Sequence, residues 1–295
     1  MLSRLSGEYN RMRRQPYKYP GQLRLVVIAV LLATLIFVPV KAKCERVPSP
    51  EEVLIWRVAA ADGDAKAQYN IGLMFQDGLG ISRDYAEAMK WYLLAARQGL
   101  VDAHCAIGKM YLYGHGVPRD YAEAMRRFLL ATNSGNMFAQ FNVGLMYHKG
   151  QGIPKDYVEA MKWYRLSAAQ GLADAQLNIG FMYYKGLGVP KDDVEALRWY
   201  LLAAAKGKDE AQYNIGQMYH EGHGVSRDYR EAIFWYRLAA EQGNAEAQRN
   251  IGHMYEYGQG VKQDLSEAAS WYKRSCDNGL PYGCERYRRL SATNH

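Results

Sequence analysis

The stretch Ala67–Gly99, AQYNIGLMFQDGLGISRDYAEAMKWYLLAARQG, decides the fold, because its skeleton occurs six times in the chain. Glycines recur every 36 residues from Gly72 to Gly252 and from Gly80 to Gly260, and aspartates recur at the same interval from Asp84 to Asp264. A fixed period of about 20 to 50 residues is typical of repeat arrays, in which each unit buries its apolar face against its neighbours. The sequence therefore predicts six stacked copies of one small unit.

Each unit is predicted to contain two helices. Apolar residues at i, i+4, i+7 and i+8 from Ala67 lie on one face of a helix over roughly residues 64–76. Glycines then interrupt the pattern, and Asp84, followed three residues later by a glutamate, is a typical N-cap for a second helix. A second apolar stripe, Ala88–Ala96, ends before Gly99, which suits a helix C-terminus. The unit is therefore predicted to be a helix-turn-helix.

The skeleton of the unit reads A-x-A-Q-x-x-x-G-x-M-Y, then G-x-G-V, then D-x-x-x-A-x-x-W-Y-x-x-A-A-x-x-G. This pattern resembles the Sel1-like repeat family, a relative of the tetratricopeptide repeat. The resemblance implies an all-α fold, a right-handed α/α superhelical solenoid of six 36-residue Sel1-like helix-turn-helix repeats with half-repeat caps. The expected repeats are residues 64–99, 100–135, 136–171, 172–207, 208–243 and 244–279. A linker and capping helix are expected over residues 43–63, and a capping helix and tail over residues 280–295.

Residues 1–42 differ from the repeats and are expected to direct export. Leu25–Val38, LVVIAVLLATLIFV, carries no charge and follows a basic segment. The run is shorter than a transmembrane span of about 20 residues and is typical of a signal-peptide core. Cleavage near Ala42 and retention of residues 25–40 as an inner-membrane anchor both remain open. The basic residues before the run predict that the N-terminus stays inside and that the body is exported to the bacterial periplasm.

The net charge of the chain comes from its N-terminal segment. The chain has 37 basic and 30 acidic residues, and residues 1–46 hold nine of the basic and two of the acidic ones, which leaves 28 of each sign in the remainder. A neutral body lacks the basic surface that nucleic-acid binding requires. Nucleic acid is therefore not an expected partner, and membrane contact is expected only through the N-terminal segment.

No catalytic residue, metal ligand or cofactor site is expected. The H-E-G-H sequence at His220–His223 lacks the spacing that puts two zinc-binding histidines on one helical face. Ser270–Lys273 matches S-x-x-K, the nucleophile motif of penicillin-recognising enzymes. Some cysteine-rich Sel1-like proteins have been linked to β-lactam binding, so a β-lactam-recognising enzyme stays as an alternative.

Cys276 and Cys284 lie eight residues apart, a spacing that is compatible with a metal site, a redox pair or a disulfide. The resemblance implies a disulfide, because cysteine-rich Sel1-like repeats carry one with this spacing and placement. Export to an oxidising compartment favours the same use. Cys105 is expected on a surface position of a first helix, and its pairing state and that of Cys44 stay open.

Positions that vary between units are expected to carry what is particular to this protein. In tetratricopeptide and Sel1-like arrays the first helices line the concave face. The variable positions of the first helices are apolar and aromatic in the middle units and polar at the ends, a profile typical of a protein-binding surface. Packing against the neighbouring unit is the alternative. The predicted partner-binding residues are Tyr69, Leu73, Lys109, Leu112, Phe141, Leu145, His148, Leu177, Phe181, Tyr184, Tyr213, Gln217, His220, Arg249 and His253.

The resemblance implies a non-catalytic protein that binds a protein partner on this face. Sel1-like proteins serve as envelope scaffolds, as adaptors and, in some bacteria, as immunity proteins that neutralise secreted antibacterial effectors, phospholipases among them. We expect a periplasmic binder, with an immunity protein against a secreted effector as its most specific form. An envelope assembly scaffold is the second expectation, and the oligomeric state stays open.

Overall fold

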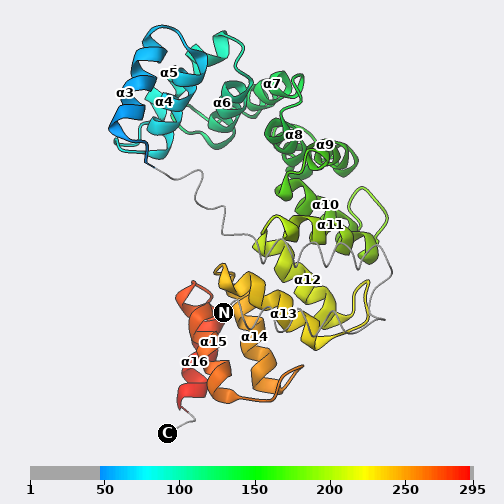
Figure 1. Ribbon diagram of the computed structural model, residues 1–295. Coiled ribbons are helices and arrows are strands. Elements are labelled where there is room, and N and C mark those ends of the chain that lie inside the picture. Colours follow the sequence, from blue (N-terminus) through cyan, green and yellow to red (C-terminus); the bar gives the residue numbers. More distant parts are fainter. Residues whose placement is uncertain (1–46, 293–295) are drawn as a thin grey trace. The chain divides into compact units, whose positions relative to one another are not determined.

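The computed structural model describes residues 47–292, which form fourteen helices and no strand (Figure 1). They fall into two compact parts, which meet in sequence at residues 175 and 176. We call residues 47–175 the N-terminal part and residues 176–292 the C-terminal part. The predicted signal peptide or anchor lies outside the described residues. Within residues 47–292 no helix is long and apolar enough to cross a bilayer.

The predicted alternation of first and second helices is confirmed, so the chain is an all-α array of helix pairs. The first helices are α4 (Ala65–Asp77), α6 (Val101–Tyr113), α8 (Met137–Lys149), α10 (Ala173–Lys185), α12 (Asp209–Glu221) and α14 (Ala245–Tyr257). The second helices are α5 (Tyr85–Arg97), α7 (Tyr121–Thr132), α9 (Tyr157–Ala169), α11 (Asp193–Ala205), α13 (Tyr229–Glu241) and α15 (Leu265–Asp277). The helices α3 (Pro50–Ala61) and α16 (Pro281–Ala292) lie before the first pair and after the last.

Local signals in the sequence set the ends of the helices. The carboxylate of Asp84 accepts a hydrogen bond from the backbone N–H of Glu87 at 2.9 Å, and the equivalent aspartate caps every second helix. Such a cap satisfies a backbone donor that has no partner inside the helix. The helix α4 ends at Gly78, whose φ of 71° is a left-handed conformation that glycine adopts at little cost.

An aromatic ring lying on a glycine joins the two helices of each unit. Tyr92 of α5 is completely buried, and a Cβ atom placed on Gly72 of α4 would lie 2.5 Å from its ring. The equivalent glycines in the other five units face Phe128, Tyr164, Tyr200, Tyr236 and Tyr272 in the same way. This close approach explains why glycine recurs inside the first helices, where it otherwise destabilises a helix.

A glutamine on each of several first helices joins it to the second helices around it. Gln68 donates to the carbonyl oxygen of Ala60 in α3 at 3.2 Å and accepts from Gln98 at the end of α5 at 2.8 Å. In the C-terminal part, Gln248 donates to the carbonyl oxygen of Ala240 at 3.0 Å and accepts from Asn278. These bonds satisfy buried amides and so fix the register between neighbouring helices.

Candidate partner-binding face

The predicted stripe on the first helices contains three sets of equivalent positions. The packing positions are Tyr69, Cys105, Phe141, Leu177, Tyr213 and Arg249, the central positions are Leu73, Lys109, Leu145, Phe181, Gln217 and His253, and the acceptor positions are Gln76, Leu112, His148, Tyr184, His220 and Glu256. Residues up to position 148 belong to the N-terminal part, and those from position 177 belong to the C-terminal part. The predicted stripe therefore supplies one candidate face in each part.

The three aromatic residues at packing positions, Tyr69, Phe141 and Tyr213, lie against the buried aromatic ring of their own unit. The ring centroid of Tyr69 is 5.5 Å from that of Tyr92, and the centroids of Tyr213 and Tyr236 are 5.8 Å apart. Phe141 lies equally close to the buried tyrosine of its unit. These rings are half-buried, so they stabilise the helix pair and leave one edge for a partner.

Three of the acceptor positions, Gln76, His148 and Glu256, contact the hydroxyl groups of the buried tyrosines. Tyr92 donates to Oε1 of Gln76 at 3.0 Å, and Tyr272 donates to Oε2 of Glu256 at 2.8 Å. A buried hydroxyl without a partner costs free energy, so a polar residue is needed at this position wherever the ring is a tyrosine.

In the second repeat the ring and the residue at the acceptor position are both apolar. Its ring is Phe128, which has no hydroxyl, and its acceptor position is Leu112. Leu112 is buried in the same apolar cluster as Phe128, so we remove it from the predicted partner-binding residues. Its side chain fills the core and cannot reach a partner.

The two histidines at acceptor positions have structural contacts as well. His148 Nδ1 lies 3.4 Å from the hydroxyl of Tyr164, and burial lowers the pKa of its imidazole, as do the cations of Lys155 and Lys149. His220 shares a hydrogen bond with Gln259 at 3.0 Å. His148 thus joins α8 to α9, and His220 joins α12 to the loop that follows α14, so only part of each imidazole is available to a partner.

The central positions of the stripe differ in their exposure to solvent. Lys109 is exposed and Phe181 is 36% exposed, whereas the other central residues are half-buried. Gln217 donates to Glu221 one turn later on α12. The six central residues differ in size, polarity and charge, which suits recognition of a partner that contacts each unit differently.

A fourth set of equivalent positions, the last residues of the first helices, was not predicted from the sequence. These end positions are exposed in all six units: Asp77, Tyr113, Lys149, Lys185, Glu221 and Tyr257. They lie four residues after the central positions and so on the same face of the helix. Extending the predicted stripe by one helical turn would have included them. Two exposed aromatic rings, Tyr113 and Tyr257, thus join the candidate faces.

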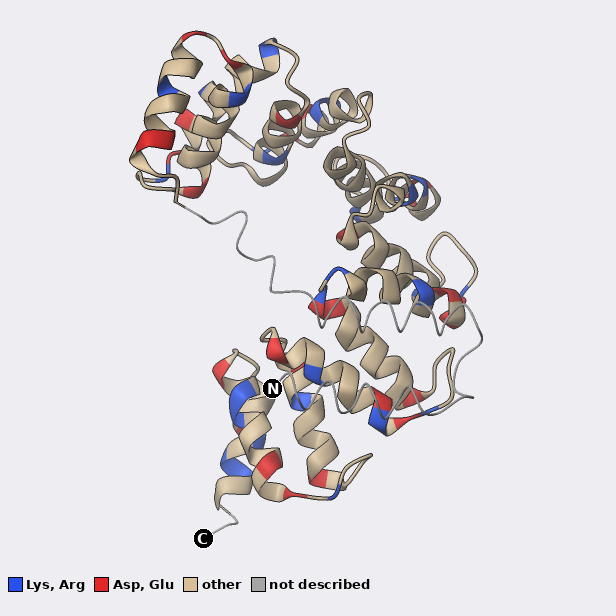
Figure 2. Ribbon diagram, in the orientation of Figure 1, with Lys and Arg blue, Asp and Glu red and all other residues tan. Residues whose placement is uncertain are grey.

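Charges of both signs are interspersed along both parts (Figure 2). On the N-terminal face Lys109 Nζ lies 5.8 Å from the ring centroid of Phe138, and on the C-terminal face the Arg249 guanidinium lies 5.6 Å from that of Tyr282. Both rings are exposed. A cation beside an exposed ring favours contacts with aromatic and acidic side chains of a partner.

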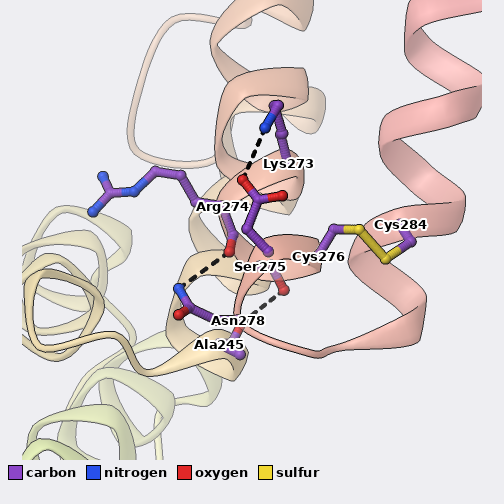
Figure 3. The surroundings of a disulfide bond; sticks show 8 residues. Ala245, Lys273, Arg274, Ser275, Cys276, Asn278 and Cys284 are labelled. Carbon is purple, nitrogen blue, oxygen red and sulfur yellow. Dashed lines mark hydrogen bonds and ion pairs between the residues drawn. A yellow bond between two sulfur atoms is a disulfide. The ribbon is translucent and has the colours of Figure 1, made fainter.

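Cys276 and Cys284 form a disulfide that joins α15 to α16 (Figure 3). They occupy the positions of Ala240 and Gln248, which are joined by a side chain-to-backbone hydrogen bond one unit earlier. The disulfide therefore replaces a non-covalent link between the same two points of neighbouring helices. The disulfide implied by the resemblance is present.

The expectation that Cys105 lies on the surface was wrong. Cys105 is unpaired and buried in the apolar cluster of the second unit, and burial raises the pKa of its thiol to about 11. It occupies a packing position, where the other units place a larger or polar side chain.

The motifs that resemble catalytic or metal sites have other contacts. Among residues 47–292 no group of three or more His, Cys, Asp or Glu side chains is placed to hold a metal ion. His223 of the H-E-G-H sequence lies 3.1 Å from the hydroxyl of Tyr184. Ser270 is exposed on α15, and Lys273 donates to Asp277 at 2.8 Å, which raises the pKa of its ammonium group. The raised pKa makes Lys273 a weaker acceptor for the proton of the Ser270 hydroxyl at neutral pH.

Comparison with known proteins identifies the repeat. Six segments match the family described as Sel1 repeat: residues 65–100, 101–136, 138–172, 173–208, 209–244 and 245–280. A Sel1 repeat protein from Oxalobacter formigenes has a similar structure, with a TM-score of 0.70 and 33% identity over 76% of this chain and 99% of that chain.

Two further proteins are similar over different lengths. The protein c5321, a protective antigen of uropathogenic Escherichia coli with an SLR fold, has a TM-score of 0.57 and 29% identity, covering 97% of this chain and 66% of that one. Chitin synthase regulatory factor 3 of Schizosaccharomyces pombe is 47% identical over 47 residues, which are 16% of this chain and 5% of the yeast protein. The family matches extend through the whole array of helix pairs, and the chain therefore belongs to the Sel1 repeat family.

Proposed function

We propose that this chain is an exported, non-catalytic protein that binds a protein partner through the central and end positions of its first helices. One observation carries the proposal: some equivalent positions keep the same residue type in every unit, and others change. Glycine, the buried ring and the capping aspartate recur from unit to unit, whereas the central and end positions change in chemistry. The fold does not constrain the residue type at the central and end positions. The side chains at these positions can therefore determine which partner is bound.

The most specific form of this proposal is a periplasmic inhibitor that neutralises a secreted effector, such as a phospholipase, by occupying its surface. Such an inhibitor needs an ordered face and no chemistry of its own. The helix pairs supply order through buried rings, capped termini and satisfied amides. The exposed rings Tyr113 and Phe181 supply the large aromatic contacts that dominate many interfaces.

A pull-down from the periplasmic fraction of the source bacterium tests the proposal. The full chain is compared with Phe181→Glu on α10 and with Leu202→Glu on α11 as the matched control. The two side chains belong to one unit and are 36% and 39% exposed, but only Phe181 lies on a first helix. Circular dichroism checks that both variants fold.

An inhibitor of the proposed kind captures one secreted enzyme, loses it with Phe181→Glu and keeps it with Leu202→Glu. Adding the purified chain to that enzyme then lowers its activity. Capture of several envelope proteins without inhibition of any enzyme supports an assembly scaffold instead. Loss of the captured protein only with Leu202→Glu places the binding face on the second helices and overturns the proposal.

A further inference from the structure

One cation lies between two apolar side chains in the row of central positions of the N-terminal part. The three residues are Leu73 on α4, Lys109 on α6 and Leu145 on α8, which are equivalent positions of three consecutive units. Leu73 and Leu145 are half-buried, whereas Lys109 is exposed. A protein segment that crosses the three first helices in turn therefore meets an apolar, a positively charged and again an apolar side chain.

The charge of Lys109 is not neutralised within the array. Among residues 47–292 no carboxylate forms an ion pair with Lys109, although Asp102 lies two turns earlier on the same helix. Asp102 has other partners, because its Oδ1 accepts a hydrogen bond from Asn136 at 3.1 Å and its Oδ2 lies 3.5 Å from Nζ of Lys66. Lys109 therefore keeps a positive charge that a carboxylate of a partner can neutralise.

Two exposed aromatic rings lie close to this lysine. Phe138, whose ring centroid is 5.8 Å from Lys109 Nζ, is 45% exposed, and Tyr113, one turn after Lys109 on α6, is 53% exposed. A partner segment that covers these rings excludes water from around the lysine. The attraction between the ammonium group and a carboxylate is stronger when water is excluded, so an acidic side chain with apolar neighbours suits this surface.

The end positions of the same three units give this surface a direction. They are Asp77, Tyr113 and Lys149, all exposed, so the first unit presents an acidic group and the third unit a basic one. A segment with a basic residue opposite Asp77 and an acidic residue opposite Lys149 is attracted in this orientation and repelled in the reverse one.

We propose that this surface of the N-terminal part binds a segment of the partner protein in which an acidic side chain lies between two apolar ones. The carboxylate contacts Lys109, and the apolar side chains contact Leu73 and Leu145. The proposal rests on the partner binding proposed above and adds the chemistry of one contact. Charge complementarity carries it, because the central cation is exposed and has no ion pair, while the residues on either side of it are apolar.

Selection from a random peptide library displayed on phage tests this chemistry directly. The immobilised full chain is compared with Lys109→Glu and with Arg97→Glu as the matched control. Both cations are exposed and lie in the same part, but Arg97 lies on a second helix, α5. Circular dichroism checks that both variants fold. An enriched peptide is then synthesised with a fluorophore, and its binding is measured by fluorescence anisotropy.

We expect the wild type and Arg97→Glu to enrich peptides that carry Asp or Glu between apolar residues, and Lys109→Glu to enrich Lys or Arg in the same place. Replacing the acidic residue of the peptide by its amide should weaken binding to the wild type about ten-fold, as for loss of one charge-assisted hydrogen bond, and should not weaken binding to Lys109→Glu. A wild type that enriches no acidic peptides, or a Lys109→Glu variant with the same preference as the wild type, overturns the proposal.

The periplasmic capture described above separates this inference from the proposed function. An enzyme that is lost with Phe181→Glu and kept with Lys109→Glu supports the proposed function and overturns the contact at Lys109. Enrichment of acidic peptides as expected, without capture of any protein from the periplasm, supports the chemistry of this surface and overturns the proposed function alone.

Discussion

The hydroxyl of Tyr272 donates a hydrogen bond to Oε2 of Glu256, sixteen residues earlier, at 2.8 Å. The same separation joins Tyr92 to Gln76, whereas Phe128 and Leu112, at the equivalent positions of the second unit, are both apolar. A ring and its acceptor therefore change together between units. At Gln76, His148 and Glu256 the acceptor side chain therefore serves the buried tyrosine before it can serve a partner.

This relationship predicts that Gln76→Leu and Tyr92→Phe act on stability as a pair. Gln76→Leu alone leaves the buried hydroxyl of Tyr92 without an acceptor, so we expect a loss of about 1–3 kcal/mol in the free energy of unfolding. Adding Tyr92→Phe recreates the Phe128 and Leu112 pair and is expected to restore most of that loss. Urea denaturation of the four proteins of the double-mutant cycle measures both effects. Additive losses would show that the hydroxyl does not depend on Gln76.

Repeat spacing and capping residues were enough to predict the helix pairs. Glycine recurs at the position of Gly72 because an aromatic ring lies on it in every unit. Aspartate recurs at the position of Asp84 because its carboxylate caps the second helix. Both requirements are therefore visible in the sequence of each unit. The roles within the predicted stripe were harder to separate. His148 and Phe181 differ in role only through contacts that form after the helices pack, and helical spacing alone places both on one face. Ile55 of α3 is 64% exposed, whereas Trp91, its equivalent one repeat later, packs on the cluster of Ala60, Ala67 and Ile71, a difference that helical spacing does not show.

Stability is predicted to fall as the pH falls below the pKa of an unfolded histidine. Burial lowers the pKa of His148, so the unfolded chain takes up a proton at this residue before the folded chain does. The stabilising contribution is thus complete above a pH of about 6.5 and is lost as the pH falls through the lower pKa of the folded state. Burial lowers the pKa of His104 and His253 in the same sense.

His148→Gln isolates the contribution of this one residue. Glutamine occupies the equivalent position 76 and accepts the hydroxyl of its tyrosine there, so the variant keeps an acceptor for Tyr164 and removes the titration. We expect a shallower decline of the melting temperature between pH 7 and pH 5 and little change at pH 8. An identical decline in both proteins would assign the pH dependence to other groups.

The buried thiol of Cys105 is predicted to react slowly in the folded protein. Burial raises its pKa to about 11, so little thiolate is present at pH 8 and reagents reach it only through opening of the unit. In a Cys44→Ser background, an aromatic disulfide reagent should modify no thiol quickly in buffer and one thiol quickly in urea. Fast modification of one thiol in buffer would contradict the burial of Cys105.

The link between α15 and α16 is predicted to tolerate replacement of the disulfide by the hydrogen bond found elsewhere in the array. Cys284→Ser removes the cross-link and is expected to cost about 2–3 kcal/mol, the value for closing a short loop. Cys276→Ala with Cys284→Gln recreates the pair Ala240 and Gln248, whose amide donates to the carbonyl oxygen at 3.0 Å. This variant should recover about 1 kcal/mol, the net worth of one hydrogen bond.

Hydrogen exchange of the amides in α16 separates these effects from global unfolding, because a capping helix with a neighbour on one side only opens first. We expect the fastest exchange in Cys284→Ser, intermediate exchange in the alanine–glutamine variant and the slowest exchange in the oxidised wild type. Reduction of the wild type should reproduce the rate of Cys284→Ser. The ion pair between Arg286 and Glu256 remains in all of these proteins and keeps α16 docked at equilibrium. Complete loss of α16 on reduction would therefore show that the disulfide, and not the buried pair, holds the end of the array.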